Sequence, residues 1–167
     1  MLRPEEAREQ FAHARTTGLV TICRSAERRH RLPRALLLAV ASRETSCRDV
    51  VGDFGHGRGV FQIDDRFHYE WLAEHGSDRP GRTPPVADAA ELAGTLLAAA
   101  LAVAHNHELA GDRATKFAAS AYNAGLGGAL AGLERGNSDL ETTGRDYGAD
   151  VVGRMHAFRP LERAQRT

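Results

Sequence analysis

The stretch ALLLAVASRETSCRDVVGDFGHGRGVFQIDD, residues 35–65, decides the expected fold. It opens with seven consecutive apolar residues, 35–41, which follow Pro33. A run that is apolar on every side is typical of a buried helix, and proline suits the first turn of a helix because no N–H donor is needed there. The stretch therefore predicts a buried helix that ends in the polar segment 42–46.

Glu44 lies near the end of this expected helix. It follows Ala41, Val40 and Leu37 by three, four and seven positions, so helical spacing places its carboxyl group in line with an apolar stripe. Partial burial and the negative end of the helix dipole both disfavour the carboxylate anion and raise the pKa. A carboxylic acid that stays protonated near neutral pH is what a general acid requires.

The second half of the stretch predicts a small β-hairpin beside the helix. Four glycines in 52–59 indicate tight turns, and the period-two pattern of 60–64 indicates a strand with Gln62 and Asp64 on one face. Asp53 would come from the turn region and Asp64 from the second strand. A protonated acid facing one or two ionised carboxylates is the arrangement used for glycoside hydrolysis. On spacing alone, an ordinary helix-end glutamate with turn aspartates remains the alternative.

Three blocks of the chain resemble the goose-type lysozyme family, whose members cleave the glycan strands of peptidoglycan. SRETSCRDVVGDFGHGRGVFQIDDRFH (42–68) is similar to the catalytic segment, SAYNAGLGG (120–128) to the Ala-Tyr-Asn-Ala-Gly motif, and TTGRDYGADVVGRMHAF (142–158) to the C-terminal helix segment. The blocks occur in family order, and the likeness covers about residues 18–158. It implies a mainly α, lysozyme-like α+β domain, with helices around a buried central helix and a small hairpin beside the catalytic cleft.

The resemblance also implies an activity. The chain would be a peptidoglycan hydrolase, or muramidase, cutting the β-1,4 bond between N-acetylmuramic acid and N-acetylglucosamine by inverting acid–base hydrolysis. Glu44 would protonate the leaving oxygen, while Asp53 and Asp64 would position and deprotonate a water. Asp65 is a weaker candidate, because strand alternation points it away from Asp64. Five further residues would line the glycan cleft: Gln62, His68, Tyr122, Asn123 and Tyr147.

Departures from the family pattern occur at Thr45, Phe54 and His56, which put fine substrate contacts in question but not the acid. Two other functions stay open. A lytic transglycosylase shares the fold and the acid, but closes the muramic residue on itself and needs no water-activating aspartates. A non-catalytic wall-binding module would keep the cleft and lose the chemistry.

Composition indicates a single domain, 1–167, with an ordinary apolar content of 42% and charged content of 26%. Net charge is zero, so nothing favours a nucleic-acid partner. The expected partners are peptidoglycan glycan strands, with chitin oligomers as a second substrate class, and the protein is expected to be a monomer. The longest apolar run, about 96–104, is shorter than the roughly 20 residues of a membrane span. No cofactor or metal is expected, since no histidines show ligand spacing.

The N-terminus lacks the apolar core of a signal peptide. An enzyme acting on the bacterial cell wall would then be a phage endolysin, part of a virion, an antimicrobial toxin delivered to a rival, or a secreted enzyme whose leader was removed. Cys23 and Cys47 are expected to be reduced, because a helix hairpin turning near Arg31 separates them by more than the roughly 7 Å that a disulfide allows between Cα atoms.

The rest of the chain predicts further helices. The longest is expected to be the central buried one and to open with an N-cap box of Asp88 and Glu91. Asp112 is expected to cap the next helix and Gly125 to stop it. The basic cluster of 24–34 is expected to be a solvated face. The expected ranges are about 5–15 (polar and open to fraying), 18–30, 66–75, 88–109, 112–123, 127–135 and a last helix from Gly144 or Asp146, with a loop at 77–85.

Overall fold

The computed structural model describes residues 2–164; the remaining residues of the expected domain, Met1 and 165–167, lie outside the described residues. The described part has seven α-helices and a small three-stranded antiparallel sheet, which confirms the expected mainly α fold. The elements are α1 (Pro4–Thr16), α2 (Leu19–Arg29), α3 (Leu36–Thr45), β1 (Val51–Gly52), the 3₁₀ turn η1 (Asp53–Gly55), β2 (Gly57–Arg58), β3 (Ile63–Asp64), α4 (Asp65–Glu74), α5 (Val86–Asn106), α6 (Gly111–Glu134), the 3₁₀ turn η2 (Thr143–Arg145) and α7 (Tyr147–Arg163).

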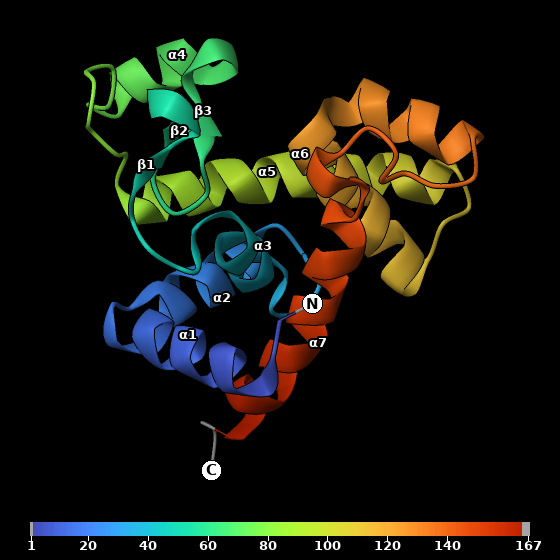
Figure 1. Cartoon of the computed structure of the whole chain (residues 1–167), viewed down its shortest axis with the longest axis horizontal. Helices are drawn as coiled ribbons and strands as arrows, with labels where there is room; N and C mark the ends of the chain where they lie inside the picture. Colours follow the sequence, from blue (N-terminus) through green and yellow to red (C-terminus); the bar gives the residue numbers. More distant parts are fainter. Residues whose placement is uncertain (1, 165–167) are drawn as a thin grey trace.

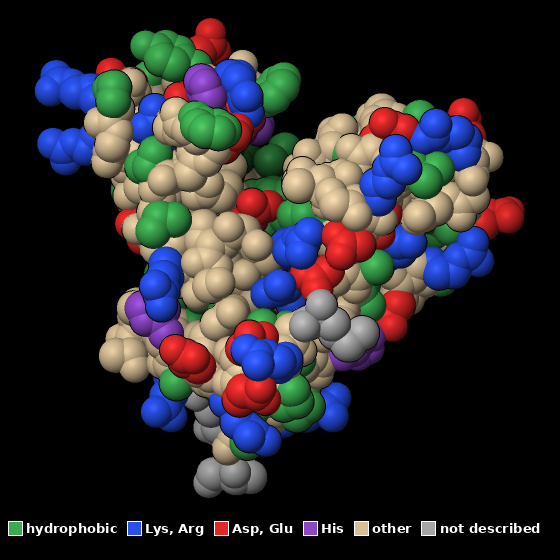
Figure 2. Space-filling model, in the orientation of Figure 1, with side chains coloured by type: hydrophobic (Ala, Val, Ile, Leu, Met, Phe, Trp, Pro, Cys, Tyr) green, Lys and Arg blue, Asp and Glu red, His purple; other side chains and the backbone are tan. Residues whose placement is uncertain are grey.

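One side of α5 borders a cavity, which is the main open space of the described structure. In Figure 1 this helix crosses the middle of the view. The sheet and α4 lie over one end of α5, and the second half of α6 lies over the other end. Helices α1, α2, α3 and α7 pack below them. The molecular surface is hollowed between the two upper parts (Figure 2).

Helix α3 is the buried helix of the fold, as its apolar run predicts. Residues 35–41 are all 0% exposed. Pro33 does not form its first turn, contrary to the expectation, because Ala35 adopts a left-handed conformation with φ 65° immediately before the helix. The buried Glu27 carboxylate instead accepts the N–H groups of Ala35 at 3.1 Å and Leu37 at 2.9 Å. These contacts satisfy donors that a helix N-terminus leaves without an intrahelical partner.

Helix α5 is not the central buried helix that the sequence predicts. Only 39% of its most apolar 18-residue window is buried, because one side of the helix borders the open space. The whole of α5, 21 residues, is long and apolar enough to cross a membrane by length and composition. The uninterrupted apolar run 96–104 therefore underestimates the length of the apolar helix. A core helix meets the same criterion, and the expected absence of a membrane partner stays a prediction.

The two predicted caps are wrong, because α5 begins at Val86 and α6 at Gly111, which leaves Asp88 and Asp112 inside the first turn of their helices. In the described structure neither Asp88 nor Asp112 caps its helix. Glu91 pairs with Arg29 of α2 rather than closing a capping box, and Asp112 accepts a bond from His156 of α7 at 2.8 Å. Each helix is therefore positioned by packing and by these cross-helix contacts.

Gly125 ends the first helical part of α6, as the sequence predicts. Its φ of 74° and ψ of 160° are not helical, and a second helical part, which corresponds to the predicted helix 127–135, follows and ends at Glu134. A non-glycine residue adopts such a conformation only at a cost. The kink leaves Leu126 exposed at the edge of the open space.

The sheet has three strands where a two-stranded hairpin is expected. Gln62, with φ 49°, closes a turn onto Gly59, so the predicted strand 60–64 shrinks to β3. The predicted faces nevertheless hold: Phe61 and Ile63 are buried, while Gln62 and Asp64 are partly exposed. The register pairs Val51 with Arg58, Gly52 with Gly57, Gly57 with Asp64 and Arg58 with Ile63.

Both cysteines are free and buried within the described chain, in line with the expected reduced pair Cys23 and Cys47. The basic cluster is only partly a solvated face. Arg34 Nε lies 2.5 Å from Oε2 of Glu162, a carboxylate that is 0% exposed, and Arg24 donates to the Glu162 carbonyl at 3.0 Å. These contacts fasten the end of α7 to α2 and to the segment before α3.

Candidate active site

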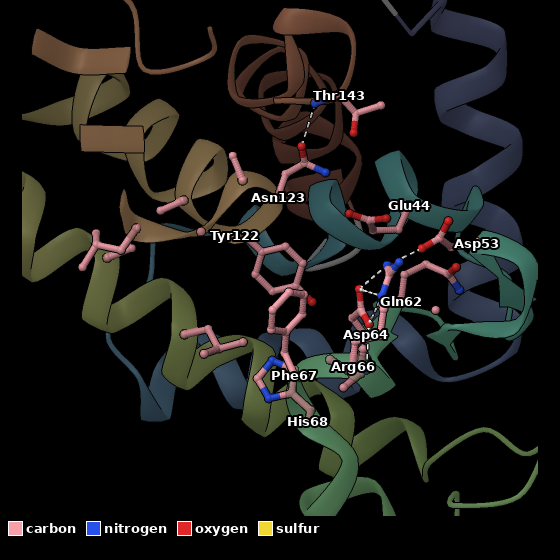
Figure 3. Close-up of a pocket in the computed structure, with 18 of the residues that line it drawn as sticks. Glu44, Asp53, Gln62, Asp64, Arg66, Phe67, His68, Tyr122, Asn123 and Thr143 are labelled. Atoms are coloured by element: carbon pink, nitrogen blue, oxygen red, sulfur yellow. Dashed lines mark hydrogen bonds and ion pairs between the residues drawn. The ribbon is translucent and has the colours of Figure 1, made fainter. Parts of the chain in front are cut away.

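The open space beside α5 is a cavity of about 890 Å³ between the sheet with α4 and the kink of α6. Carboxylates gather at the sheet end, and apolar side chains of α5 and α6 form the other end (Figure 3). Seven of the eight residues predicted for the site line it: Glu44, Asp53, Gln62, Asp64, His68, Tyr122 and Asn123.

Glu44 projects into this cavity from the last turn of α3. The preceding turns of α3 are fully buried, and the helix ends at the cavity wall. The Glu44 carboxyl group therefore lines the cavity while remaining half-buried. Burial raises the pKa of Glu44 above its ordinary value, while a hydrogen bond from the Tyr147 hydroxyl and the positive charge of Arg43 partly offset that rise. The carboxyl group is thus biased toward the protonated form that a proton donor needs.

Asp53 and Asp64 meet at one guanidinium group, that of Arg66. Nη2 of Arg66 lies 2.5 Å from Oδ2 of each aspartate, and Nε lies 2.9 Å from Oδ1 of Asp64. Asp64 also caps α4 by accepting the Arg66 N–H at 2.9 Å. The side-chain bonds from Arg66 hold the pKa of Asp64 below its ordinary range. Figure 3 shows this ionic cluster, Asp53–Arg66–Asp64, beside Glu44.

Asp65 faces away from the cluster, as the alternation predicts. Its carboxylate binds Arg58 at 2.9 Å and His56 at 2.8 Å, and these partners lower its pKa. The Arg58 side chain is 6% exposed, so Asp65 balances a buried charge under the sheet. Asp65 therefore connects the start of α4 to β2 through Arg58.

The Gln62 side chain lies against Gly52 and Gly57 of the sheet, and the residue lines the cavity. Its amide nitrogen donates to the carbonyls of Val50 at 3.1 Å and Gly59 at 2.8 Å. A Cβ atom placed on Gly52 or Gly57 would lie 2.2 or 2.3 Å from the Gln62 Oε1 atom, so a larger residue at either position would displace the Gln62 side chain. The glycines of this segment therefore form turns and also leave space for the Gln62 side chain.

Tyr122 and Asn123 form the wall opposite the sheet, from the first half of α6. The Tyr122 hydroxyl donates to the Phe61 carbonyl at 2.8 Å, which ties α6 to the turn before β3. Asn123 Oδ1 accepts the N–H of Thr143 at 2.8 Å, which leaves the amide NH₂ group to contact a ligand. His68 lies below them in Figure 3, and partial burial lowers its pKa, which favours the neutral ring.

Tyr147 does not line the cavity, contrary to the prediction. It is 2% exposed and lies behind Glu44, to which its hydroxyl group donates. The Arg43 guanidinium lies 5.5 Å from the centroid of its ring and pairs with Asp150 at 3.2 Å. Burial raises the pKa of Tyr147 well above its usual range, so the phenol stays a donor to Glu44.

Arg66 and Phe67 are site residues that sequence reasoning missed. The signal for Arg66 was present, because an aspartate at a helix N-cap accepts the N–H group two or three residues later. The period-two pattern of 60–64 instead places Asp64 within a strand, and a strand residue caps no helix. Phe67 is 80% exposed and also lines the cavity.

The arrangement separates two kinds of carboxyl group in one cavity. Glu44 is biased toward the protonated form and Asp64 toward the ionised form, which is how a pair of acids divides into a proton donor and a base. Among residues 2–164, no group of three or more His, Cys, Asp or Glu side chains is placed to hold a metal ion. Glu44 can protonate a leaving oxygen, and the carboxylate of Asp64 can orient a water.

Comparison with known proteins leaves the family open. No protein-family model matches the chain, and no curated protein matches it significantly in sequence. The resemblance of the three sequence blocks to goose-type lysozymes therefore stays a prediction.

Proposed function

We propose that the protein is a peptidoglycan hydrolase that cuts the β-1,4 bond between N-acetylmuramic acid and N-acetylglucosamine. The observation that carries this proposal is the pairing, in one cavity, of the Glu44 carboxyl group, whose pKa burial raises, with the ionised Asp64 carboxylate, whose pKa Arg66 lowers. The cavity volume is in the range of pockets that enclose small ligands.

In the proposed reaction, Glu44 gives its proton to the glycosidic oxygen as the bond from that oxygen to the anomeric carbon breaks. A water attacks the anomeric carbon from the opposite face and loses a proton to the carboxylate of Asp64 or Asp53. The transition state resembles an oxocarbenium ion, so negative charge beside the sugar ring stabilises it. The tyrosine donor behind Glu44 also stabilises the carboxylate left after proton transfer.

One observation favours a second candidate, a lytic transglycosylase. Arg66 binds both aspartates, and a carboxylate with a lowered pKa is a weak base toward water. A transglycosylase needs the acid but no activated water, because a hydroxyl group of the muramic residue attacks instead. The proposal for hydrolysis therefore requires that Arg66 leave room for a water on at least one aspartate.

Mass analysis of the soluble products from purified peptidoglycan tests both candidates. Hydrolysis yields muropeptides with ordinary reducing ends, and this is the expected result. Anhydro-muropeptides, each lighter by one water, would establish the transglycosylase and refute the hydrolase. A Glu44→Gln sample provides the matched control, since it keeps the shape of the cavity and removes the proton donor.

A further inference from the structure

A second, smaller pocket of about 280 Å³ is formed by α2 and the segment that leads into α3. It is separate from the cavity that contains Glu44, since the two share no lining residue. Four of the six residues that line it are arginines, although the net charge of the chain is zero. The lining residues are Arg24, Glu27, Arg28, Arg31, Leu32 and Arg34.

The connection between α2 and α3 brings these arginines together. Arg24 and Arg28 lie one turn apart on α2, Arg31 follows the end of that helix, and Arg34 precedes α3. The backbone of Arg31 is left-handed, with φ 54°, which is costly for a residue with a side chain. Backbone strain of this kind is often found where a protein contacts a ligand.

The carboxylates beside the arginines do not cancel their charge. Glu162 is 0% exposed and pairs with Arg34 at 2.5 Å and with Arg24 at 3.5 Å. Glu27 is turned toward α3, where its two oxygens accept backbone N–H groups. Four guanidinium groups against two carboxylates leave the pocket positively charged even when both acids are ionised.

Arg28 and Arg31 are available to bind a ligand. Both residues are exposed, and within residues 2–164 neither side chain forms a hydrogen bond or an ion pair. Arg34 adds a further donor, because its Nη2 atom is buried and has no hydrogen-bond partner in the described part of the chain. A buried donor without a partner costs free energy, so an acceptor supplied by a ligand would stabilise it.

We propose that this pocket binds the phosphate group of an anionic ligand, independently of the function proposed for the large cavity. A guanidinium group is a planar fork of N–H donors that matches two phosphate oxygens, and it stays charged at every physiological pH. The volume is near the lower limit for small-ligand pockets, which suits one phosphate group with a small substituent. Duplex nucleic acid is a poorer fit, because its binding uses about six to ten phosphate contacts along a surface.

Two ligands would carry this group: a small phosphate monoester and a phosphodiester polymer of the cell wall. Calorimetry with glycerol phosphate and with poly(glycerol phosphate), at an ionic strength held constant with chloride, tests the pocket and separates the two. We expect saturable binding by the full chain. Arg28→Gln combined with Arg31→Gln is expected to weaken this binding about tenfold, with an unchanged thermal midpoint because neither side chain supports the fold.

Arg79→Gln combined with Arg82→Gln is the matched control. It removes the same charge from two exposed arginines of the loop 77–85, and these residues line neither the pocket nor the cavity. Binding to this control variant is expected to equal binding to the parent.

The outcomes separate the ligands and the failures. Binding of the polymer alone, or more tightly than the monoester, assigns the pocket to a wall polymer if only the Arg28 and Arg31 changes weaken it. Equal or tighter binding of the monoester, weakened by the same changes alone, assigns the pocket to a small phosphate ester. Equal weakening by the two double variants indicates diffuse attraction to positive charge and overturns the proposal. Absence of saturable binding of both probes by the parent protein also overturns it.

Discussion

Replacing Tyr147 by phenylalanine probes the control of the proposed acid most directly. The change removes one oxygen atom, the donor to Glu44 Oε1, from a buried site. The ring stays, and with it the contact to the Arg43 guanidinium at 5.5 Å from the ring centroid. The hydrogen bond stabilises the Glu44 carboxylate, and it is the largest of the effects that oppose the rise in its pKa.

The expected size follows from the strength of that bond. A hydrogen bond to a charged group contributes about 1.5–3 kcal/mol, and one pKa unit corresponds to about 1.4 kcal/mol. Water in the cavity replaces part of the lost bond, so we expect the pKa of Glu44 to rise by about one unit. Glu44 then stays protonated to higher pH, and the basic limb of the pH–rate profile moves upward by about one unit. The acidic limb, which reports the proposed base Asp64, stays in place.

The raised pKa of Glu44 also makes the stability of the fold depend on pH in a definite direction. The folded pKa of Glu44 lies above its unfolded value, so stability is highest below the unfolded pKa and falls as pH rises through the folded pKa. Phenylalanine at position 147 removes a bond to the ionised form. The variant therefore loses more thermal stability than the wild type on the basic side of that pKa, and little on the acidic side.

Initial rates on a defined glycan oligomer across the pH range provide the assay, with circular dichroism to verify the fold. Tyr69→Phe is the control, because it removes the same atom from an exposed tyrosine. A basic limb that stays in place, or moves downward, refutes the inference that the Tyr147 hydroxyl sets the pKa of the proposed acid.

Four further predictions concern the cavity and its surroundings. Glu44→Gln abolishes lysis of a wall suspension at an unchanged thermal midpoint, and lysis near the wild-type rate would exclude Glu44 as the acid. Asp53→Asn and Asp64→Asn each leave measurable activity, and the double variant loses more than the product of the single losses, because both groups act on one water; losses that simply multiply would contradict this. Asp65→Asn keeps kcat but lowers the free energy of unfolding by about 1–3 kcal/mol in urea, since a buried arginine loses its carboxylate. Phe54→Gly raises that free energy by about 0.5–1 kcal/mol, as backbone strain is relieved and no packing is lost; an unchanged urea midpoint would remove the strain argument.

The parts of the fold that the sequence predicts well are those with local causes. Seven apolar residues in a row leave a helix no exposed face, and α3 is buried for that reason. The glycines of 52–59 indicate tight turns, and Gly55 and Gly59 indeed adopt left-handed conformations, with φ 101° and φ 73°. Neither inference needs knowledge of a distant partner.

The predictions that fail depend on partners far apart in the chain. Asp112 resembles an N-cap in sequence, but α6 begins one residue earlier, at Gly111, and Asp112 binds His156 of α7. Tyr147 resembles a cleft residue, yet the packing of α7 against α3 places it behind Glu44. A one-dimensional pattern cannot rank such competing partners, because their separation is set by the packing of whole helices.

The ionic cluster carries the main consequence for mechanism. The same guanidinium that keeps Asp64 ionised also weakens it as a base, since a stabilised carboxylate gains less by taking a proton. Burial instead raises the pKa of Glu44, and the Tyr147 hydrogen bond and the Arg43 charge only partly offset that rise, so the group stays biased toward the protonated form that the proposed acid requires. The pKa of Glu44 is therefore shifted in the direction that its proposed role requires, whereas the pKa of Asp64 is shifted in the direction that weakens a base. Loss of activity in a Glu44 variant fits a hydrolase and a transglycosylase equally, and only the chemical form of the product ends can separate the two.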